Sequence, residues 1–327
     1  MNFNDFYHGK KVLVTGADGF MGSHLTERLV SYGANVLAFV RWSALITPHN
    51  IQLKNISHLK DKVKIISGDI GSYDIIETIR KEKPEIIFHL AAEAYVNKSF
   101  DQPREVIDAN VTGTLNILHA CLDENMKPQN FIKRIVVTSS SEIYGTYNEN
   151  IKESFTMYPS SPYGASKAAA DRLAYSYYFT YNLPIAIIRP FNTYGPRHTY
   201  DAPPRFISLA LDGKDITVYG DGEQARDLMY VDDTINGFLL MGMHEKAIGE
   251  AVNFGTGQDT KIIDLAKLVI ELSRSDSKIV HLEPRPSEVQ RLCCDNSKAK
   301  ELFNWQPEIS IKEGLRRNIE FAKQNRG

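Results

Sequence analysis

Short runs of β-branched and aliphatic residues alternate with amphipathic stretches through the first half of this 327-residue chain, and this alternation constrains the fold most strongly. Strands that alternate with helices predict βαβ crossovers, and therefore a doubly wound parallel sheet with helices on both faces, an α/β fold of the Rossmann type. Runs such as Ile86-Ile87-Phe88 are apolar throughout, as expected for strands that are buried on both faces. The predicted strands are 11–15, 35–40, 63–67, 86–90, 134–138 and 185–189, and the first predicted helix is 21–32.

The pattern of predicted strands and helices changes near residue 190. Four prolines interrupt residues 190–204, and shorter strands and helices follow them. We therefore expect two domains. The first is a cofactor-binding domain of residues 1–190, completed by a segment near 225–250, and the second is a smaller mixed α/β substrate domain of residues 191–327.

Composition excludes several classes of protein. The 38 Lys and Arg residues nearly balance the 40 Asp and Glu residues, which argues against a general binder of nucleic acid or acidic membranes. No apolar run approaches the ~18 residues of a membrane span, and the first residues do not resemble a signal peptide. The three cysteines show no CxxC spacing and suit a reducing compartment, and the nine histidines are scattered without metal-ligand spacing. We expect a cytoplasmic protein without a metal site.

A glycine-rich turn connects the first predicted strand to the first predicted helix. Gly16, Gly19 and Gly22 stand where the chain turns sharply, where backbone must approach a pyrophosphate, and where the helix packs on the strand. The start of the helix, with Phe20 and Met21, offers free N–H groups and the positive end of the helix dipole to the phosphates. The turn therefore predicts a dinucleotide site.

The end of the second predicted strand bears on the choice of cofactor. Many NAD enzymes have an acidic residue here that holds the adenosine 2′-hydroxyl, whereas this strand ends Val40-Arg41-Trp42-Ser43. Arg41 would pair with a 2′-phosphate and so favours NADP. Asp18 in the glycine-rich turn would repel that phosphate, so NAD remains the alternative.

A tyrosine and a lysine stand one turn apart at the start of a strongly helical stretch. Ser161 is a good N-cap, Pro162 suits the first helical position, and Tyr163 and Lys167 then share one helix face. An ammonium beside a phenol lowers the pKa of the phenol, which makes Tyr163 a base for a hydroxyl proton. Ser140, just after the strand at 134–138, would hydrogen-bond the same sugar oxygen.

Taken together, these motifs resemble the extended short-chain dehydrogenase/reductases that act on nucleotide sugars. The resemblance covers nearly the whole chain and is carried also by residues 89–93, 192–197, 218–222 and 226–233. It implies a tightly bound nicotinamide cofactor that is regenerated in every turnover, and a nucleotide-diphosphate hexose as substrate. It also implies a homodimer packed through a four-helix bundle that includes the Tyr163 helix, with no nucleic acid or membrane partner.

The resemblance further assigns residues to each ligand. Asp69 and Ile70 match the pair that contacts adenine. The residues that match other cofactor contacts after the fourth strand are Leu90, Ala91 and Ala92. Those that match substrate contacts are Glu93, Ser99, Asn192, Arg205, Tyr219, Arg226 and Arg291; of these, Asn192 and the last two arginines match contacts to the diphosphate and ribose, and Tyr219 would flank the base.

Glu142 indicates the subclass, because 4,6-dehydratases have glutamate here and 4-epimerases have a small hydroxyl or apolar residue. In the dehydratases, oxidation at C4 acidifies the C5 proton, a carboxylate removes it, water leaves from C6 and hydride returns to C6. The dTDP-glucose enzymes have aspartate at the position of Ser141. The pair Ser141-Glu142 is instead similar to the pair found in the GDP-mannose enzymes. Residues 91–99 look more like the dTDP-glucose enzymes, so the nucleotide and the hexose stay open.

The runner-up activity is that of a UDP-glucuronate decarboxylase, which also has Ser-Glu at this point, and a 4-epimerase is the next. A non-catalytic cofactor-sensing protein is the remote alternative, since such proteins typically lose the Tyr/Lys pair. Because Ser141 replaces the acid, the group that protonates the leaving C6 hydroxyl stays open, and Glu142 is a candidate for both base and acid.

Overall fold

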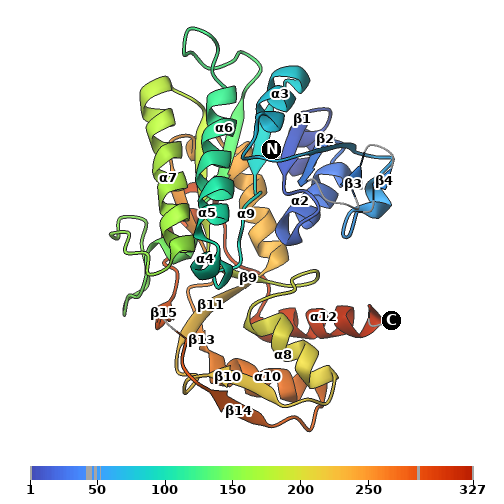
Figure 1. The fold of residues 1–327 in the computed structure, drawn as a ribbon, viewed down its shortest axis with the longest axis vertical. Helices are drawn as coiled ribbons and strands as arrows, with labels where there is room; N and C mark the ends of the chain where they lie inside the picture. The colour runs from blue at the N-terminus through green and yellow to red at the C-terminus, as the bar shows by residue number, and fades with distance from the viewer. Residues whose placement is uncertain (1, 42–45, 48–49, 52, 286–287, 326–327) are drawn as a thin grey trace. The chain divides into compact units, whose positions relative to one another are not determined.

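The computed structural model describes residues 2–41, 46–47, 50–51, 53–285 and 288–325 (Figure 1). The chain forms two compact units, and it passes between them several times. The first unit comprises Met1–Ser140, Ser161–Arg189 and Ile235–Val252. The second comprises Ser141–Ser160, Pro190–Thr234 and Asn253–Gly327.

A seven-stranded sheet forms the centre of the first unit, with strand order β12-β8-β7-β6-β1-β2-β5. The five pairings from β8 to β5 are all parallel, so the doubly wound α/β fold predicted from the sequence is confirmed. The observed strands begin and end within a residue of the predicted ones. The six strands that match predictions are β1 (Lys11–Thr15), β2 (Asn35–Arg41), β5 (Lys64–Gly68), β6 (Ile86–His89), β7 (Arg134–Thr138) and β8 (Ile185–Pro190). The seventh, β12 (Ala251–Phe254), was not predicted.

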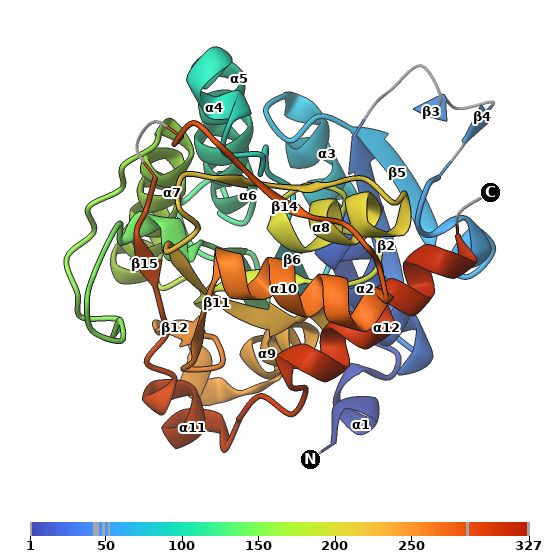
Figure 2. The same ribbon diagram turned by 90° about the horizontal axis from the view of Figure 1, so that it is seen from below.

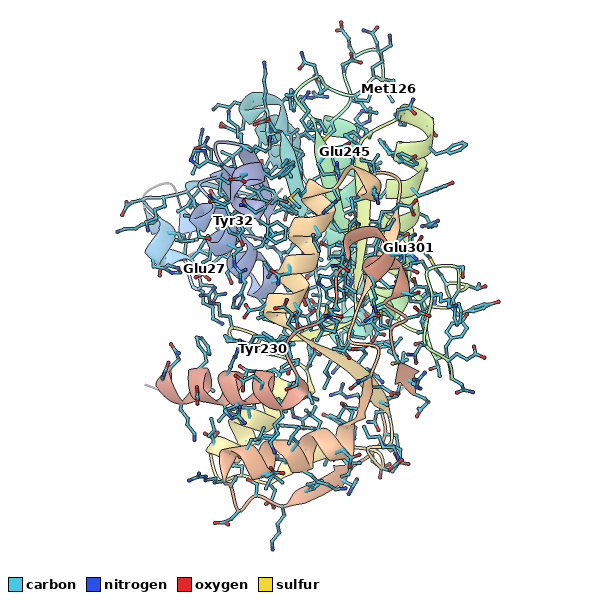
Figure 3. All side chains as sticks on the ribbon, turned by 180° about the vertical axis from the view of Figure 1, so that it is seen from behind. Glu27, Tyr32, Met126, Tyr230, Glu245 and Glu301 are labelled. Carbon is cyan, nitrogen blue, oxygen red and sulfur yellow. The ribbon has the colours of Figure 1, made fainter. Side chains whose placement is uncertain are left out.

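Helices cover both faces of this sheet. On one face lie α3 (Tyr73–Glu82), α6 (Gly113–Ala120) and α7 (Pro162–Tyr181), with a buried aliphatic core beneath them (Figure 1). On the other face α2 (Phe20–Ser31) lies beside α9 (Val231–Met243) (Figure 3). Arg28 Nη1 of α2 donates to Asn236 Oδ1 of α9 at 3.5 Å. The shorter elements of this unit are α1 (Phe3–Tyr7), β3 (Ile46–Thr47), β4 (Asn50–Ile51), η1 (Ser57–Leu59), α4 (Lys98–Asp101), α5 (Pro103–Ile107), the π-helical turn η2 (Asp108–Thr112) and η4 (Glu245–Ala247).

The strand order of the sheet changes direction between β1 and β6. In open α/β sheets, ligands bind outside the carboxyl ends of the strands at such a switch point. The Gly16 turn follows β1, and the Leu90–Ala92 segment follows β6. The two segments are in close contact, because a Cβ added to Gly16 would lie 3.0 Å from the Ala91 Cα. The fold therefore places the predicted phosphate turn at the expected ligand site of this sheet.

The second unit contains two small sheets and a helical layer. Strand β11 (Ala225–Tyr230) pairs in parallel with β9 (Asn192–Tyr194) and β15 (Arg291–Leu292), and antiparallel with β13 (Asp259–Lys261). Strand β10 (Ile216–Tyr219) pairs in parallel with β14 (Ile279–Leu282). Three helices pack on one another, as Figure 2 shows: α8 (Ala202–Leu211), α10 (Ile262–Ser273) and α12 (Ile311–Gln324). The unit also contains the short 3₁₀ turn η3 (Ser141–Ile143) and the helix α11 (Ser297–Phe303).

Within the described part of the chain, no helix is long and apolar enough to cross a bilayer. The same residues contain no cluster of three or more His, Cys, Asp or Glu side chains that could hold a metal ion. The three cysteines, Cys121, Cys293 and Cys294, are buried free thiols.

Candidate active site

The glycine-rich turn of the first unit fits a pyrophosphate. Gly16 adopts φ +70°, a left-handed conformation that favours glycine, and its N–H donates to Phe39 O at 3.0 Å. A Cβ on Gly22 would lie 2.0 Å from the Gly16 carbonyl oxygen, so only glycine lets α2 pack this closely on the turn. Gly19 is the N-cap of α2 and has no side chain to cap the helix, so no capping side chain competes with an anion at the start of this helix, where Phe20 and Met21 stand.

Asp18 organises the loop beside this turn. Its carboxylate accepts backbone N–H groups from Lys54 at 2.8 Å, Asn55 at 2.7 Å and Ile56 at 3.0 Å. Three such bonds largely satisfy the carboxylate, and this weakens the repulsion that it would exert on a 2′-phosphate.

Arg41 is exposed at the end of β2. The residues Trp42 and Ser43, which belong to the same predicted motif, lie outside the described residues. The charge of Arg41 reaches α5, since Lys98 and, to a smaller extent, Arg41 lower the pKa of the Glu105 carboxyl. An exposed guanidinium at this strand end is suited to a 2′-phosphate.

The remaining predicted cofactor residues line the ends of β5 and β6. Asp69 Oδ1 accepts the Gly71 N–H at 2.7 Å, which forms a tight turn after β5. Ile70 is buried against Gly113, where an added Cβ would meet its side chain at 2.8 Å. Leu90, Ala91 and Ala92 are partly exposed just after β6. The structure thus collects these residues at the carboxyl edge of the first unit's sheet.

His89, the last residue of β6, is buried in a directional hydrogen-bond chain. Thr114 donates its hydroxyl proton to Asn110 O at 2.7 Å, so its oxygen must accept from His89 Nε2 at 3.0 Å. His89 Nδ1 then accepts from the Thr15 hydroxyl at 2.9 Å. Burial lowers the pKa of His89 to about 3, and Lys167 contributes to the shift, so the ring stays neutral. This confirms His89 as a satisfied packing residue.

Helix α7 carries the predicted reaction centre. Ser161 Oγ accepts the Gly164 N–H at 3.0 Å, a side-chain cap worth about 1 kcal/mol, and Pro162 occupies the first turn, as predicted. Lys167 is buried and donates from Nζ to the backbone oxygen of Thr138, the last residue of β7. Burial lowers the pKa of Lys167 to about 8, and the charge of Asp171 opposes this shift.

Tyr163 stands one turn before Lys167 on α7 and is partly exposed, which suits a group that must reach a substrate. Ser140 is buried two residues beyond the end of β7, the strand to which Lys167 is bonded. The first unit therefore unites Tyr163 and Lys167 with the strand end that precedes Ser140.

Asn110 is a residue of this site that the sequence analysis missed. It lies in the π-helical turn η2, and its Nδ2 donates to Ser166 Oγ at 2.9 Å, while Ser166 donates to Tyr163 O at 2.7 Å. The same side chain exchanges two hydrogen bonds with the Glu93 backbone, at 2.8 and 3.1 Å. Asn110 thereby ties the loop after β6 to the first turn of α7. No motif in the sequence singles out Asn110, because its burial and its place in the π-helical turn are visible only in the structure.

The two predicted substrate residues of the first unit are engaged within it. Glu93 accepts from Lys98 Nζ at 2.8 Å, and Lys98 also pairs with Glu105 at 2.9 Å. Ser99 is fully buried, and its hydroxyl donates to Val96 O at 2.6 Å. Ser99 is thus committed to its own loop, whereas Glu93 remains partly exposed.

Glu142 belongs to the second unit, in the short 3₁₀ turn η3. Glu142 is partly buried, and burial raises the pKa of its carboxyl group above the ordinary value. Arg226 opposes this shift, while the nearby charges of Asp201 and Glu288 add to it. Ser141 beside it is buried. A carboxyl group with a raised pKa is suited to take up a proton and to return it.

Cations of the second unit gather around Tyr219. The guanidinium of Arg285 lies 4.1 Å from the Tyr219 ring centroid, and that of Arg205 lies 5.0 Å from it and contacts Thr217. Arg226 pairs with Glu288 at 3.2 Å.

Among the described residues, the buried Nε of Arg285 and the buried Oδ1 of Asn192 have no hydrogen-bond partner. Buried polar atoms without partners are typical of groups that bind a ligand.

Arg285 was not singled out from the sequence, although it stands in the same motif as Arg291. Arg291 itself is occupied by the protein, because it donates to Asp259 at 2.6 Å, to Asn148 O at 2.7 Å and to Asn150 at 2.9 Å. Of the two arginines, Arg285 is therefore better placed to bind a diphosphate.

Comparisons with known proteins agree with this geometry. A family model described as GDP-mannose 4,6 dehydratase matches residues 13–318. The chain belongs to this family. It is one of the short-chain dehydrogenase/reductase families of nucleotide-sugar dehydratases and epimerases, as predicted from the sequence motifs.

Individual members of the family differ in their activities. The chain is 34% identical to a UDP-glucuronate 4-epimerase of Thermodesulfobacterium geofontis, with 96% of each chain covered. It is 32% identical to a trifunctional UDP-glucose 4,6-dehydratase of Arabidopsis thaliana, but spans only about half of that protein (48%).

Solved structures of the family are also similar. The dTDP-glucose 4,6-dehydratase DesIV of Streptomyces venezuelae, solved with NAD, gives a TM-score of 0.87 at 28% identity over 97% of this chain and 98% of its own. The UDP-glucuronic acid 4-epimerase of Bacillus cereus, also solved with NAD, gives 0.86 at 30% identity over 96% and 99%.

Substitution of Arg41 tests its role in cofactor selection. Arg41→Ala should weaken the binding of NADP by on the order of tenfold, because one charge-assisted contact to the 2′-phosphate is lost, and should leave the binding of NAD nearly unchanged. Isothermal titration of both cofactors measures the two affinities. Arg80→Ala, an exposed arginine of α3, is the control. An equal loss for both cofactors would contradict the role of Arg41.

Proposed function

We propose that the protein is a nucleotide-sugar 4,6-dehydratase that converts an NDP-hexose to an NDP-4-keto-6-deoxyhexose. In this proposal the first unit binds the nicotinamide dinucleotide and the second unit binds the nucleotide sugar. The fold, the glycine turn and the Tyr163–Lys167 pair support the oxidation step, which dehydratases and epimerases share. The choice between these activities depends on Glu142.

The observation that carries the proposal is the charge around Glu142. Burial is the largest cause of the raised pKa of Glu142; the charge of Arg226 lowers this pKa, and the charges of Asp201 and Glu288 raise it further. Arg226 is itself paired with Glu288. A substrate with a carboxylate at C6, such as a glucuronate, would add another anion to surroundings that are already net negative. A hexose with a neutral hydroxymethyl group at C6 would not.

Oxidation at C4 requires a base for the hydroxyl proton. Tyr163 would take this proton, helped by the Lys167 ammonium one turn away, and Ser140 would donate a hydrogen bond to the same oxygen. When bound, a nicotinamide cofactor would supply the hydride acceptor. The buried hydrogen bond from Lys167 to Thr138 O supports this role, because it fixes the ammonium at the sheet edge.

Elimination of water requires a base at C5 and an acid at C6. The 4-ketone acidifies the C5 proton, so the Glu142 carboxylate can remove it. The same carboxyl group would then protonate the C6 hydroxyl, which leaves as water, and its raised pKa supports both steps. Ser141, which has no ionisable side chain, leaves Glu142 to do both. The hydride taken from C4 would return to C6, and a proton from solvent would add to C5, which completes the 4-keto-6-deoxy product.

The diphosphate of the substrate would be bound by arginines of the second unit. We propose Arg226 and Arg285 as its ligands, with Arg205 and Asn192 beside them and Tyr219 next to the base. The arginines around Tyr219 and the partnerless atoms of Arg285 and Asn192 support this assignment. Arg291 would not contact the diphosphate itself. It would act indirectly, through its hydrogen bonds to the loop that contains Asn148 and Asn150.

The cofactor itself is proposed to be a nicotinamide dinucleotide, either NADP or NAD. The exposed Arg41 supports NADP. The NAD bound in the solved dehydratase DesIV and in the solved 4-epimerase supports NAD.

Loss of the Glu142 carboxylate separates the oxidation from the elimination. Glu142→Gln should still oxidise C4, seen as absorbance of the reduced cofactor, but should no longer exchange the C5 hydrogen with solvent deuterium. Mass spectrometry of the recovered sugar nucleotide measures the exchange. Tyr163→Phe is the matched control, because it should block oxidation and exchange together. Persistent C5 exchange in Glu142→Gln would place the C5 base elsewhere.

We also propose a homodimer formed through α5, α6 and α7. The exposed apolar side chains Ile107, Leu115, Tyr175 and Phe179 on these helices support it, as does the packing of α5 and α6 on α7. Burial of such residues between two copies would remove apolar area from water.

Phe179 tests this interface, because it is 72% exposed within the single chain. Phe179→Asp should convert the dimer to a monomer in sedimentation velocity, since burial of an unpaired carboxylate at an interface is costly. Tyr73→Asp, on α3 and 79% exposed, should leave the dimer intact. A Phe179→Asp protein that sediments as the wild type would contradict the proposed interface.

A further inference from the structure

Helix α7 has a third functional group in register with Tyr163 and Lys167. Asp171 is one turn beyond Lys167, so the three side chains follow one another at i, i+4 spacing along the helix. Asp171 is completely buried, in contrast to the exposed carboxylates typical of a helix surface. A charged group buried this deeply must have partners.

Two arginines hold the Asp171 carboxylate. Arg189 at the end of β8 donates from Nε to Oδ2 at 2.8 Å and from Nη2 to Oδ1 at 3.0 Å, and its side chain is also buried. Arg172 donates from Nε to Oδ1 at 3.1 Å, and its side chain is half exposed. These pairs lower the pKa of Asp171 against the effect of burial, so the group stays ionised.

We propose that Asp171, clamped by Arg189, is a positioning residue that holds Lys167 as a charged ammonium while leaving its Nζ free of a direct carboxylate contact. The inference rests on the proposed function of Lys167 in the oxidation step. Because both Asp171 oxygens accept from arginines, Asp171 acts on Lys167 through its charge. Lys167 Nζ instead donates to Thr138 O, and its two remaining protons can serve other acceptors.

Besides burial, the charge of Asp171 shifts the pKa of Lys167. Three further titratable groups are the ring of His89 on β6, whose pKa burial and the charge of Lys167 lower and which is neutral, the phenol of Tyr163 on α7, and Arg189 on β8, which is bonded to Asp171. None of these is an anion when Tyr163 is protonated. Asp171 therefore supplies the negative charge that opposes the desolvation of Lys167.

The experiment titrates Lys167 directly, without substrate. Protein labelled with ¹³C at lysine Cε is followed by NMR across pH, and Lys167→Met identifies the signal. In Asp171→Asn, Lys167 should lose its proton about one pH unit lower than in the wild type, because the loss of a neighbouring charge has about that effect. The alkaline limb of turnover should move in the same direction.

Arg172→Gln should shift the titration of Lys167 in the opposite direction from Asp171→Asn. It removes a cation from Asp171 at a half-exposed position, so the protein should fold and Lys167 should titrate higher than in the wild type. Glu245→Gln is the control. Glu245 is an exposed carboxylate of the same unit, labelled in Figure 3, that pairs with the buried Arg134 at 3.1 Å. Breaking this pair should not change the pH at which Lys167 titrates.

Opposite shifts in Asp171→Asn and Arg172→Gln support the proposal, whereas equal or absent shifts overturn it. If Asp171→Asn does not fold, the Arg172→Gln titration alone decides, and an unshifted signal there overturns the proposal. If Lys167 shifts as expected but no sugar nucleotide is turned over by the wild type, only the proposed function fails.

Discussion

The hydrogen bond from the buried Lys167 ammonium to Thr138 O is the interaction on which the first unit's site depends. It joins helix α7 to the carboxyl end of β7 and brings a positive charge to the edge of the sheet where parallel strands end. A buried lysine is costly unless its charge is compensated. The backbone oxygen and the charge of Asp171 compensate it, and Tyr163 gains an ammonium on its own helix face.

A continuous set of hydrogen bonds supports this arrangement from the other side. It runs from Thr15 beside the glycine turn through His89 and Thr114 to the Asn110 backbone, and from the Asn110 side chain to Ser166 on α7. Each group has its partner, so the network has a single proton arrangement. The network links the cofactor turn to the helix of Tyr163 and restrains both. Such restraint matters because small displacements of catalytic groups lower the reaction rate strongly.

The sequence was sufficient for features that depend on local physics. Apolar runs predicted the strands, Ser161 and Pro162 predicted the start of α7, and Gly16 and Gly22 predicted the turn that only glycine can form. Features that depend on distant residues were out of reach. Nothing local indicates that Asp259 and two asparagines occupy Arg291, that Arg285 lies over Tyr219, or that Arg189 clamps Asp171. These pairings arise from the packing of segments far apart in the chain.

We propose that Glu142 turns a common C4 oxidation into a dehydration. The most direct test of this proposal is incubation of the wild-type protein with GDP-, UDP-, CDP- and dTDP-hexoses and with UDP-glucuronate, followed by mass spectrometry of the products. We expect one of the neutral hexoses to lose the mass of one water and UDP-glucuronate to stay unconverted. Loss of CO₂ from UDP-glucuronate, or inversion at C4 without any change of mass, would contradict it.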